Sequence, residues 1–356
     1  MKSAVDIFSG AGGLSIGAEM AGIKTILAVE FDKHAADSFK KNHKKATVLN
    51  QDIRTVNPLE HTKKFPFILM GGPPCQGFSI ANTKTRNLDN PNNWMFKEYY
   101  RFLKELEPEW FLFENVEGFK SFDKGKFALN IEEEFKKLGY ETSSSVLTAS
   151  DFGVPQKRNR FFIVGNKNGI KFDFSSLKKK SIVTVGEALS DLPKGLQNGE
   201  HREICSYTKN ADSLYLKTMR EKAKAPTQNL ISRNKDYVIE RYKYIRPGKN
   251  WQDIPSHLMQ NYSNTKNMHS GIYKRLDSSQ PSVVIANYRK SMLIHPEEDR
   301  GLSLREAARL QSFPDHVIFE GPLSYKQQQI GNAVPPLLGK TIFDKIIAYS
   351  SIKLNS

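Results

Sequence analysis

The sequence predicts an α/β fold with a mostly parallel sheet in its first half, because short apolar runs alternate there with helical patterns. Five runs are typical of strands: AVDIF, TILAVE, FPFILM, WFLFENV and RFFIVG. The stretches KEYYRFLKELE and KFALNIEEEFKKLG place apolar residues three and four positions apart, as one face of a helix requires. Gly139 is well placed to end the second helix. Alternation of this kind puts functional loops at the carboxyl ends of the strands.

The second half is more polar and begins with a basic run at 178–180. Residues 181–271 show weak periodicity, although TVGE near their start is a capping box that predicts a helix. A second capping box, Ser303 with Glu306 in SLREAARLQSFP, starts a later helix that Pro314 is expected to end.

The length of 356 residues favours two domains, with one domain carrying a large insertion as the alternative. We expect a large catalytic and cofactor-binding domain over residues 1–180 plus 326–356, and a small domain over 181–325.

The composition favours a polyanionic partner. Lys and Arg number 53 against 38 Asp and Glu, and the excess of +15 is spread along the chain, which fits nucleic acid better than a membrane surface. A run of 18 apolar residues and a secretory leader are both absent from the sequence, so we expect a cytoplasmic protein with no membrane association. The two cysteines, Cys75 and Cys205, lack metal-ligand spacing and are expected to be free thiols.

A glycine-rich loop with Gly10, Gly12 and Gly13 lies between a predicted strand and a predicted helix. Glycines there allow a ligand to approach the backbone. Glu30 follows the next strand, where nucleotide-binding folds hold ribose hydroxyls, and Asp52 could accept from an adenine amino group. The pattern favours an adenosine-type ligand, and its departure from GxGxxG disfavours a dinucleotide. The alternative is a tight turn with two solvated acids.

The stretch GGPPCQGFS presents Cys75 on a loop stiffened by two prolines. Nearby arginines would raise the thiolate fraction, and Arg158 and Arg160 are expected to share one face of a strand. Glu114 ends an apolar strand, where burial could keep it protonated as a proton donor. The alternatives are a buried cysteine, a Glu114–Arg158 ion pair and surface arginines. Cys205 has no such context and is expected to be inert.

Six separated motifs resemble, in order, those of the cytosine-5 DNA methyltransferases, in particular bacterial enzymes of the restriction-modification type: DIFSGAGG, GGPPCQGFS, ENV, QKRNR, RLQSFPD and QIGNAVP. The resemblance covers about residues 4 to 165 and 275 to 345. It implies an S-adenosylmethionine-dependent methyltransferase (Rossmann-like) large domain and a smaller, mixed target-recognition domain, with DNA in the cleft between them.

The resemblance also implies roles for individual residues. Cys75 resembles the nucleophile that attacks carbon 6 of cytosine, and Glu114 resembles the acid that contacts ring nitrogen 3 and the exocyclic amine. Arg158 and Arg160 resemble the pair that orients the base and the catalytic groups. The implied methyl donor is S-adenosylmethionine, which leaves as S-adenosylhomocysteine, and no metal is implied. The residues expected around it are Phe8, Gly10, Gly12, Leu14, Glu30, Phe31, Asp52, Ile53, Pro74 and Asn332.

In this chemistry the sulfur adds to carbon 6, which makes carbon 5 nucleophilic, and the base must first be flipped out of the duplex. The polar segment after Cys75 is expected to close over double-stranded DNA, with Lys84 and Arg86 near phosphates. Residues 181 to about 272 fall where the family carries its target-recognition region, and their interleaved Lys, Arg and Tyr suit contacts with phosphates and base edges.

Three alternatives remain at this point. The chain could methylate transfer RNA, against which stand the long middle region and the absence of a CFT signature. It could bind DNA without catalysis, or it could be a nicotinamide oxidoreductase. We expect a monomer, with a cognate restriction endonuclease as a hypothetical partner.

Overall fold

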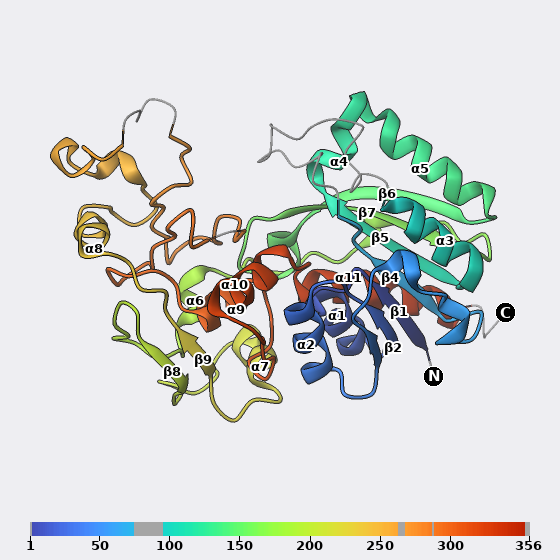
Figure 1. The fold of residues 1–356 in the computed structure, drawn as a ribbon, viewed down its shortest axis with the longest axis horizontal. Coiled ribbons are helices and arrows are strands. Elements are labelled where there is room, and N and C mark those ends of the chain that lie inside the picture. The colour runs from blue at the N-terminus through green and yellow to red at the C-terminus, as the bar shows by residue number, and fades with distance from the viewer. Residues whose placement is uncertain (1, 75–94, 263–267, 287, 353–356) are drawn as a thin grey trace. The chain divides into compact units, whose positions relative to one another are not determined.

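The computed structural model describes residues 2–74, 95–262, 268–286 and 288–352 (Figure 1). The chain forms two compact units. Unit 1 comprises Met1–Phe152, Asn159–Lys180 and Val334–Ser356, and unit 2 comprises Gly153–Arg158 and Ser181–Ala333. Residues 326–333 fall in unit 2, although the predicted large domain includes them.

Unit 1 is built on a seven-stranded sheet with the order β3-β2-β1-β4-β5-β7-β6. Its strands are β1 (Ser3–Ile7), β2 (Lys24–Val29), β3 (Thr47–Leu49), β4 (Ile68–Gly71), β5 (Trp110–Val116), β6 (Glu141–Thr148) and β7 (Asn159–Asn166). Pairing is parallel from β3 through β5, and β7 is antiparallel to both β5 and β6. The predicted mostly parallel sheet is therefore confirmed. Strand β6 was not predicted, because its sequence ETSSSVLT lacks an apolar run.

The helices described in unit 1 are α1 (Gly13–Met20), α2 (Lys33–Asn42), α3 (Phe96–Leu106), α4 (Glu117–Ser121), α5 (Lys126–Lys137) and α11 (Pro336–Ile352). Gly139 ends α5 as predicted, with a left-handed φ of 85°. Helices α1 and α11 approach closely at Gly17, where an added Cβ would lie 2.6 Å from the carbonyl oxygen of Pro336. Nothing larger than glycine fits at this position without a shift of backbone.

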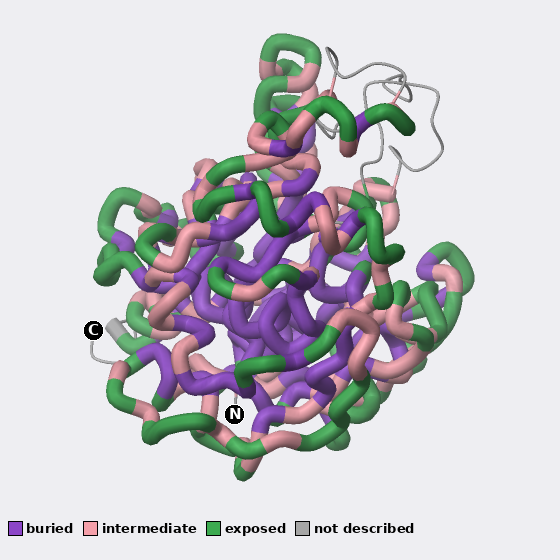
Figure 2. Tube along the Cα trace, turned by 90° about the vertical axis from the view of Figure 1, so that its left-hand side faces the viewer, coloured by how far each residue is buried: buried purple, intermediate pink, exposed green. Residues whose placement is uncertain are grey.

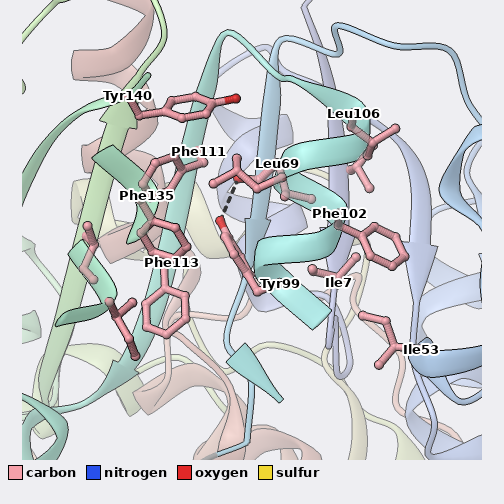
Figure 3. Close-up of a cluster of buried hydrophobic side chains, with 14 of the residues drawn as sticks. Ile7, Ile53, Leu69, Tyr99, Phe102, Leu106, Phe111, Phe113, Phe135 and Tyr140 are labelled. Carbon is pink, nitrogen blue, oxygen red and sulfur yellow. Dashed lines mark hydrogen bonds between the residues drawn. The ribbon is translucent and has the colours of Figure 1, made fainter. Parts of the chain in front are cut away.

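An aromatic cluster joins α3 and α5 to one face of the sheet (Figure 3). The ring of Tyr99 in α3 lies 5.2 Å from that of Phe113, and the ring of Phe135 in α5 lies 4.8 Å from that of Phe111. The Tyr99 hydroxyl donates to the carbonyl oxygen of Leu69 in β4 at 3.2 Å. Because side chains alternate along a strand, Trp110 of β5 points to the opposite face, where it stacks on Tyr349 of α11.

Unit 2 contains a two-stranded antiparallel sheet, β8 (His201–Ile204) with β9 (Thr227–Leu230), and five α-helices in its described part. These are α6 (Val185–Leu189), α7 (Leu214–Arg220), α8 (Asp236–Tyr242), α9 (Leu304–Leu310) and α10 (Leu323–Asn332). The predicted capping box of α9 is present. The prediction that Pro314 ends α9 is wrong, because the helix stops at Leu310 and Ser312 turns the chain with a left-handed φ of 59°.

Buried ion pairs stabilise unit 2. The guanidinium of Arg309 contacts Asp191 at 2.9 Å and Asp315 at 2.5 Å, and all three side chains are inaccessible to solvent. A buried charge is tolerated only when it is paired, so these residues depend on one another. Buried residues gather in the interior and exposed residues lie on the outer segments of the chain (Figure 2). Within the described ranges, no helix is long and apolar enough to cross a bilayer.

Truncation of Phe135 should destabilise unit 1. Phe135→Ala leaves a cavity in the aromatic cluster and is expected to lower the free energy of unfolding by about 3–5 kcal/mol. Leu129→Ala on the same helix is the control, because Leu129 is 62% exposed and its truncation should change stability by less than about 0.5 kcal/mol. Urea denaturation followed by circular dichroism measures both, and equal effects would contradict the packing described.

Candidate active site at the carboxyl edge of the sheet

Loops from five neighbouring strands meet at one edge of the unit 1 sheet. Phe8 follows β1, Glu30 follows β2, Asp52 lies three residues beyond β3, Gly72 follows β4, and Glu114 lies near the end of β5. Because these strands are parallel, their carboxyl ends share an edge. The predicted cofactor and catalytic groups of unit 1 are thereby brought to one side of the fold.

The glycine-rich loop after β1 is held by Glu30. The backbone N–H of Gly10 donates to Oε2 of Glu30 at 2.7 Å, and the N–H of Asp32 donates to Oε1 at 2.7 Å. Gly10 and Gly12 have left-handed φ values of 55° and 89°. An added Cβ at Gly10 would meet no atom within 4 Å, whereas one at Gly12 would lie 2.6 Å from Nε2 of His43. The loop is therefore open beside Gly10 and closely packed at Gly12.

Burial and hydrogen bonds have opposite effects on the pKa of Glu30. Burial raises its pKa, and the two N–H donors from Asp32 and Gly10 oppose that shift. Asn50 donates to the carbonyl oxygens of Glu30 and Phe31, both at 2.9 Å, and so fixes the chain after β2. The Phe31 side chain is 76% exposed. An exposed aromatic ring beside a fixed carboxylate can stack on a planar ring while the carboxylate accepts hydrogen bonds.

Asp52 is engaged within its own turn. Its carboxylate accepts from the backbone N–H of Arg54 at 3.0 Å and pairs with Nη2 of Arg54 at 2.5 Å. The hydrogen bonds from Arg54 lower the pKa of Asp52. The adjacent Ile53 is buried, as is Leu14 in α1. Asp52 is thus an ionised acceptor, and part of its capacity is already used by Arg54.

The carboxyl group of Asp6, which the sequence did not indicate, is buried and is hydrogen-bonded to α1 just after the glycine-rich loop. The Ser15 hydroxyl in α1 donates to Oδ2 of Asp6 at 2.6 Å, and Thr25 in β2 donates to Ser15 at 3.0 Å. Burial raises the pKa of Asp6 to about 7, the Ser15 hydrogen bond opposes this rise, and the charge of Glu30 adds to it. Because Asp6 lies inside an apolar strand run, no loop pattern indicated its role.

The catalytic carboxylate proposed from the sequence forms an ion pair across two strands. Nε of Arg160 in β7 lies 2.8 Å from Oε1 of Glu114 in β5, and both side chains are 12% exposed. Burial lowers the pKa of Arg160, and the charge of Glu114 opposes this shift. The partner of Glu114 in this ion pair is Arg160, whereas the alternative considered above paired it with Arg158.

The loop that leads to Cys75 begins against this ion pair. An added Cβ at Gly72 would lie 2.4 Å from Oε2 of Glu114, so only glycine allows the backbone to approach the carboxylate this closely. Asn115 donates from Nδ2 to the carbonyl oxygen of Pro73 at 3.2 Å. Pro74 is exposed. Cys75, and with it Lys84 and Arg86, lies outside the described residues.

Arg158 occupies a different environment from Arg160. It precedes β7, belongs to unit 2 and is almost fully buried. Its guanidinium donates to the carbonyl oxygens of Ile285 at 3.0 Å and Gly331 at 2.7 Å. The expectation that the two arginines share one face of a strand is therefore wrong, because only Arg160 lies on the strand.

Two further predicted residues lie in unit 2. Asn332 is the last residue of α10 and is exposed. Cys205 is half-buried, and burial raises the pKa of its thiol, with Arg202 opposing the shift. A raised thiol pKa reduces the thiolate fraction, which agrees with the expectation that Cys205 is inert.

The raised pKa of Asp6 predicts a pH-dependent contribution to stability. Native Asp6 retains its proton up to about pH 7, whereas the unfolded chain loses it near 3.8, so its contribution falls as pH rises between these values. The slope is at most about 1.4 kcal/mol per pH unit. The free energy of unfolding relative to Asp6→Asn should therefore decline from pH 5 to pH 7 and level off above. Urea titrations at each pH measure both proteins. If the free energies of unfolding of wild type and Asp6→Asn changed equally with pH, the raised pKa assigned to Asp6 would be contradicted.

Comparison with known proteins gives the family. The sequence matches the C-5 cytosine-specific DNA methylase family over residues 2–348. The chain is 36% identical to the type II methyltransferase M1.HphI of Haemophilus parahaemolyticus over 96% of this chain and 86% of that protein. It is 33% identical to M.DdeI of Desulfomicrobium norvegicum over 97% of this chain and 88% of that protein.

Solved structures share the fold. A protein from an Escherichia coli prophage, described as a DNA modification methyltransferase, superposes with a TM-score of 0.81 at 25% identity, covering 99% of this chain and all of that one. The methyltransferase EhMeth of Entamoeba histolytica gives a TM-score of 0.61 at 14% identity over 98% of each chain, which shows likeness of fold alone. On the match across nearly its whole length, the chain belongs to the C-5 cytosine-specific DNA methylase family.

Proposed function

We propose that this chain transfers a methyl group from S-adenosylmethionine to carbon 5 of a cytosine in a short duplex DNA sequence, with Cys75 as nucleophile. The observation that carries the proposal is the Glu114–Arg160 ion pair beside Gly72, the residue that starts the loop bearing Cys75. Asn115 holds Pro73 two residues before the sulfur. A carboxyl, a guanidinium and the base of the Cys75 loop therefore lie together.

The residues after β1 and β2 fit S-adenosylmethionine. The Glu30 carboxylate accepts from the backbone N–H groups of Gly10, Asp32 and Phe31, and its remaining lone pairs leave acceptor capacity for the ribose hydroxyls. The exposed Phe31 ring would stack on adenine, and Asp52 would accept from the adenine amino group. The open space beside Gly10 would admit the remainder of the cofactor. When bound, the cofactor supplies an electrophilic methyl group on a positively charged sulfur.

The chemistry at the base follows from Cys75 and Glu114. The Cys75 thiolate forms a bond to carbon 6, and the displaced electron pair makes carbon 5 nucleophilic. In its protonated form, with a proton taken up from solvent when the base binds, Glu114 would donate a hydrogen bond or proton at nitrogen 3, which stabilises the charge that develops in the ring. Arg160 holds the Glu114 carboxyl in place. After carbon 5 is methylated, its proton would pass to solvent water, the electron pair of that carbon–hydrogen bond would restore the double bond between carbons 5 and 6, and the sulfur would leave as the thiolate.

The contacts of Arg158 suggest a positioning role for this residue. Its guanidinium joins the chain before β7 to the carbonyl oxygens of Ile285 and Gly331. The ion pair with Glu114 is made by Arg160.

The substrate and partners follow from the family. A cytosine inside a duplex is out of reach of any side chain, so the target base would be flipped out at a cost of a few kcal/mol. Residues 181 to about 272 would read a short sequence. The methyl mark would protect that sequence from a cognate restriction endonuclease, acting as a separate protein on the same site.

The first test is methyl transfer from labelled S-adenosylmethionine to mixed-sequence duplex DNA, with bisulfite sequencing as the readout. We expect 5-methylcytosine at one short motif, and none with Cys75→Ser. Transfer to RNA but not DNA, or full activity of Cys75→Ser, would sink the proposal.

Glu114→Gln should lower the rate of methyl transfer while DNA binding persists. Glutamine keeps the size of the side chain but loses its proton-donating and charge-pairing capacity, so we expect a loss in kcat of about 10²–10⁴-fold. Single-turnover methylation measures the rate. Glu117→Gln, at the start of the adjacent α4, is the control and should stay near wild type; an unchanged rate for Glu114→Gln would remove Glu114 from the mechanism.

Glu30→Gln should weaken cofactor binding. Loss of the charged acceptor is expected to raise the Kd for S-adenosylmethionine about tenfold to a hundredfold, since hydrogen bonds to a charged group contribute about 1.5–3 kcal/mol. Isothermal titration calorimetry without DNA gives the Kd. Asp37→Asn, on the surface of α2, is the control, and equal Kd values for the two variants would argue against a ribose site at Glu30.

A further inference from the structure

The edge of the unit 1 sheet opposite the candidate active site is strongly basic. Here the chain enters β1, β2, β3 and β4, and the amino terminus marks this side in Figure 1. Eight lysines lie within or next to the segments that enter these strands: Lys2, Lys24, Lys40, Lys41, Lys44, Lys45, Lys63 and Lys64. We call these eight residues the lysine edge.

Parallel pairing places these lysines side by side although they are distant in sequence. Ser3 pairs with Lys24, and the backbone N–H of Lys24 donates to the carbonyl oxygen of Lys2 at 2.9 Å. The ammonium group of Lys2 lies 4.6 Å from the ring centre of Phe67, just before β4. Four neighbouring strands at about 4.8 Å spacing make a row roughly 15 Å long.

Much of this charge is not neutralised by nearby carboxylates. Lys40, Lys41, Lys44 and Lys45 are exposed, and within the described ranges none of them forms an ion pair. The exception is Lys64, which pairs with Glu107 at 3.1 Å. Elsewhere in unit 1 some exposed lysines are paired along helices, as in Lys136–Glu133 and Lys137–Glu134, and others, such as Lys104, stand singly among the described residues. The lysine edge differs in that unpaired lysines are gathered at one edge of the sheet.

A helix dipole explains only part of the cluster. Lys40 and Lys41 lie in the last turn of α2, where positive charge is favourable. Lys2, Lys24 and Lys63 are outside any helix, so this cause does not apply to them. Repulsion among like charges that gather without partners disfavours the folded state, and a bound polyanion would relieve it.

The lysine edge lies at the opposite ends of the strands from the candidate active site. The strands between the two edges have five to six residues in β1 and β2, which separates the edges by about 15–20 Å. Phosphates that contact the lysine edge would lie about this far from a base at the candidate active site, which suits a stretch of duplex outside the one being methylated. Duplex DNA offers one negative charge per about 1.7 Å of axis, which suits a row of lysines and requires no base contact.

We infer that the lysine edge is a second, sequence-independent DNA-binding surface, which contacts the phosphate backbone of a duplex segment other than the one being methylated. This inference rests on the proposed function for one point, namely that the bound polyanion is DNA. A surface of this kind would keep the enzyme on long DNA between target sites.

The test replaces Lys40, Lys41, Lys44 and Lys45 together by glutamine, and in a matched control by arginine, which keeps the charge. Binding to linear duplex DNA of several hundred base pairs is measured across a salt series. With glutamine, the slope of log K against log salt should fall by about two to four, since each phosphate contact contributes about 0.9. The arginine variant should keep the wild-type slope, and methylation of a short single-site duplex should be unchanged in both variants.

Three outcomes would overturn the inference. These are an unchanged slope with glutamine, an equal loss with arginine, or stronger competition by double-stranded RNA than by DNA of the same length. Failure of the proposed function would give a different result from failure of this inference. The wild-type protein would then methylate no duplex, but its binding to long DNA would still depend on the four lysines.

Discussion

The ion pair between Glu114 and Arg160 is the interaction on which the geometry of the candidate site depends. A carboxylate and a guanidinium that are both largely buried stabilise each other, and either one alone would be costly to bury. Their 2.8 Å contact depends on the antiparallel pairing of β5 with β7. Since the carboxylate also abuts Gly72, the start of the Cys75 loop is fixed relative to both charges.

The parallel half of the sheet organises the other side of the same edge, where the proposed cofactor residues lie. Glu30 closes the glycine-rich loop through Gly10, and Asp6 fastens the first turn of α1 through Ser15. These two carboxyl groups are close enough for the charge of one to raise the pKa of the other. The same parallel order collects lysines at the opposite edge, so one topology produces two surfaces of different chemistry.

Unit 2 depends on buried arginines to a greater extent than on a large sheet. Arg309 pairs with Asp191 and Asp315, and Arg158 is held by backbone carbonyls. Removal of one member of such a group leaves a buried charge or carbonyl unsatisfied, which is more costly than removal of the whole group. These buried arginines accompany a hydrophobic cluster around Tyr242 and Tyr273 in the same unit.

The sequence by itself determined the apolar strands of the first half, the glycine-rich loop, the capping box of α9 and the order of the motifs, because these depend on local periodicity, backbone preference and residue type. It did not determine β6, which lacks an apolar run. It indicated Glu114 and Glu30 as site residues for the same reason. Only the tertiary structure decided that Arg160 pairs with Glu114, that Arg158 faces backbone carbonyls, and that Asp6 accepts from Ser15 in the first turn of α1. These features join residues far apart in the chain, and their partners are set by strand pairing and burial, which no local pattern specifies.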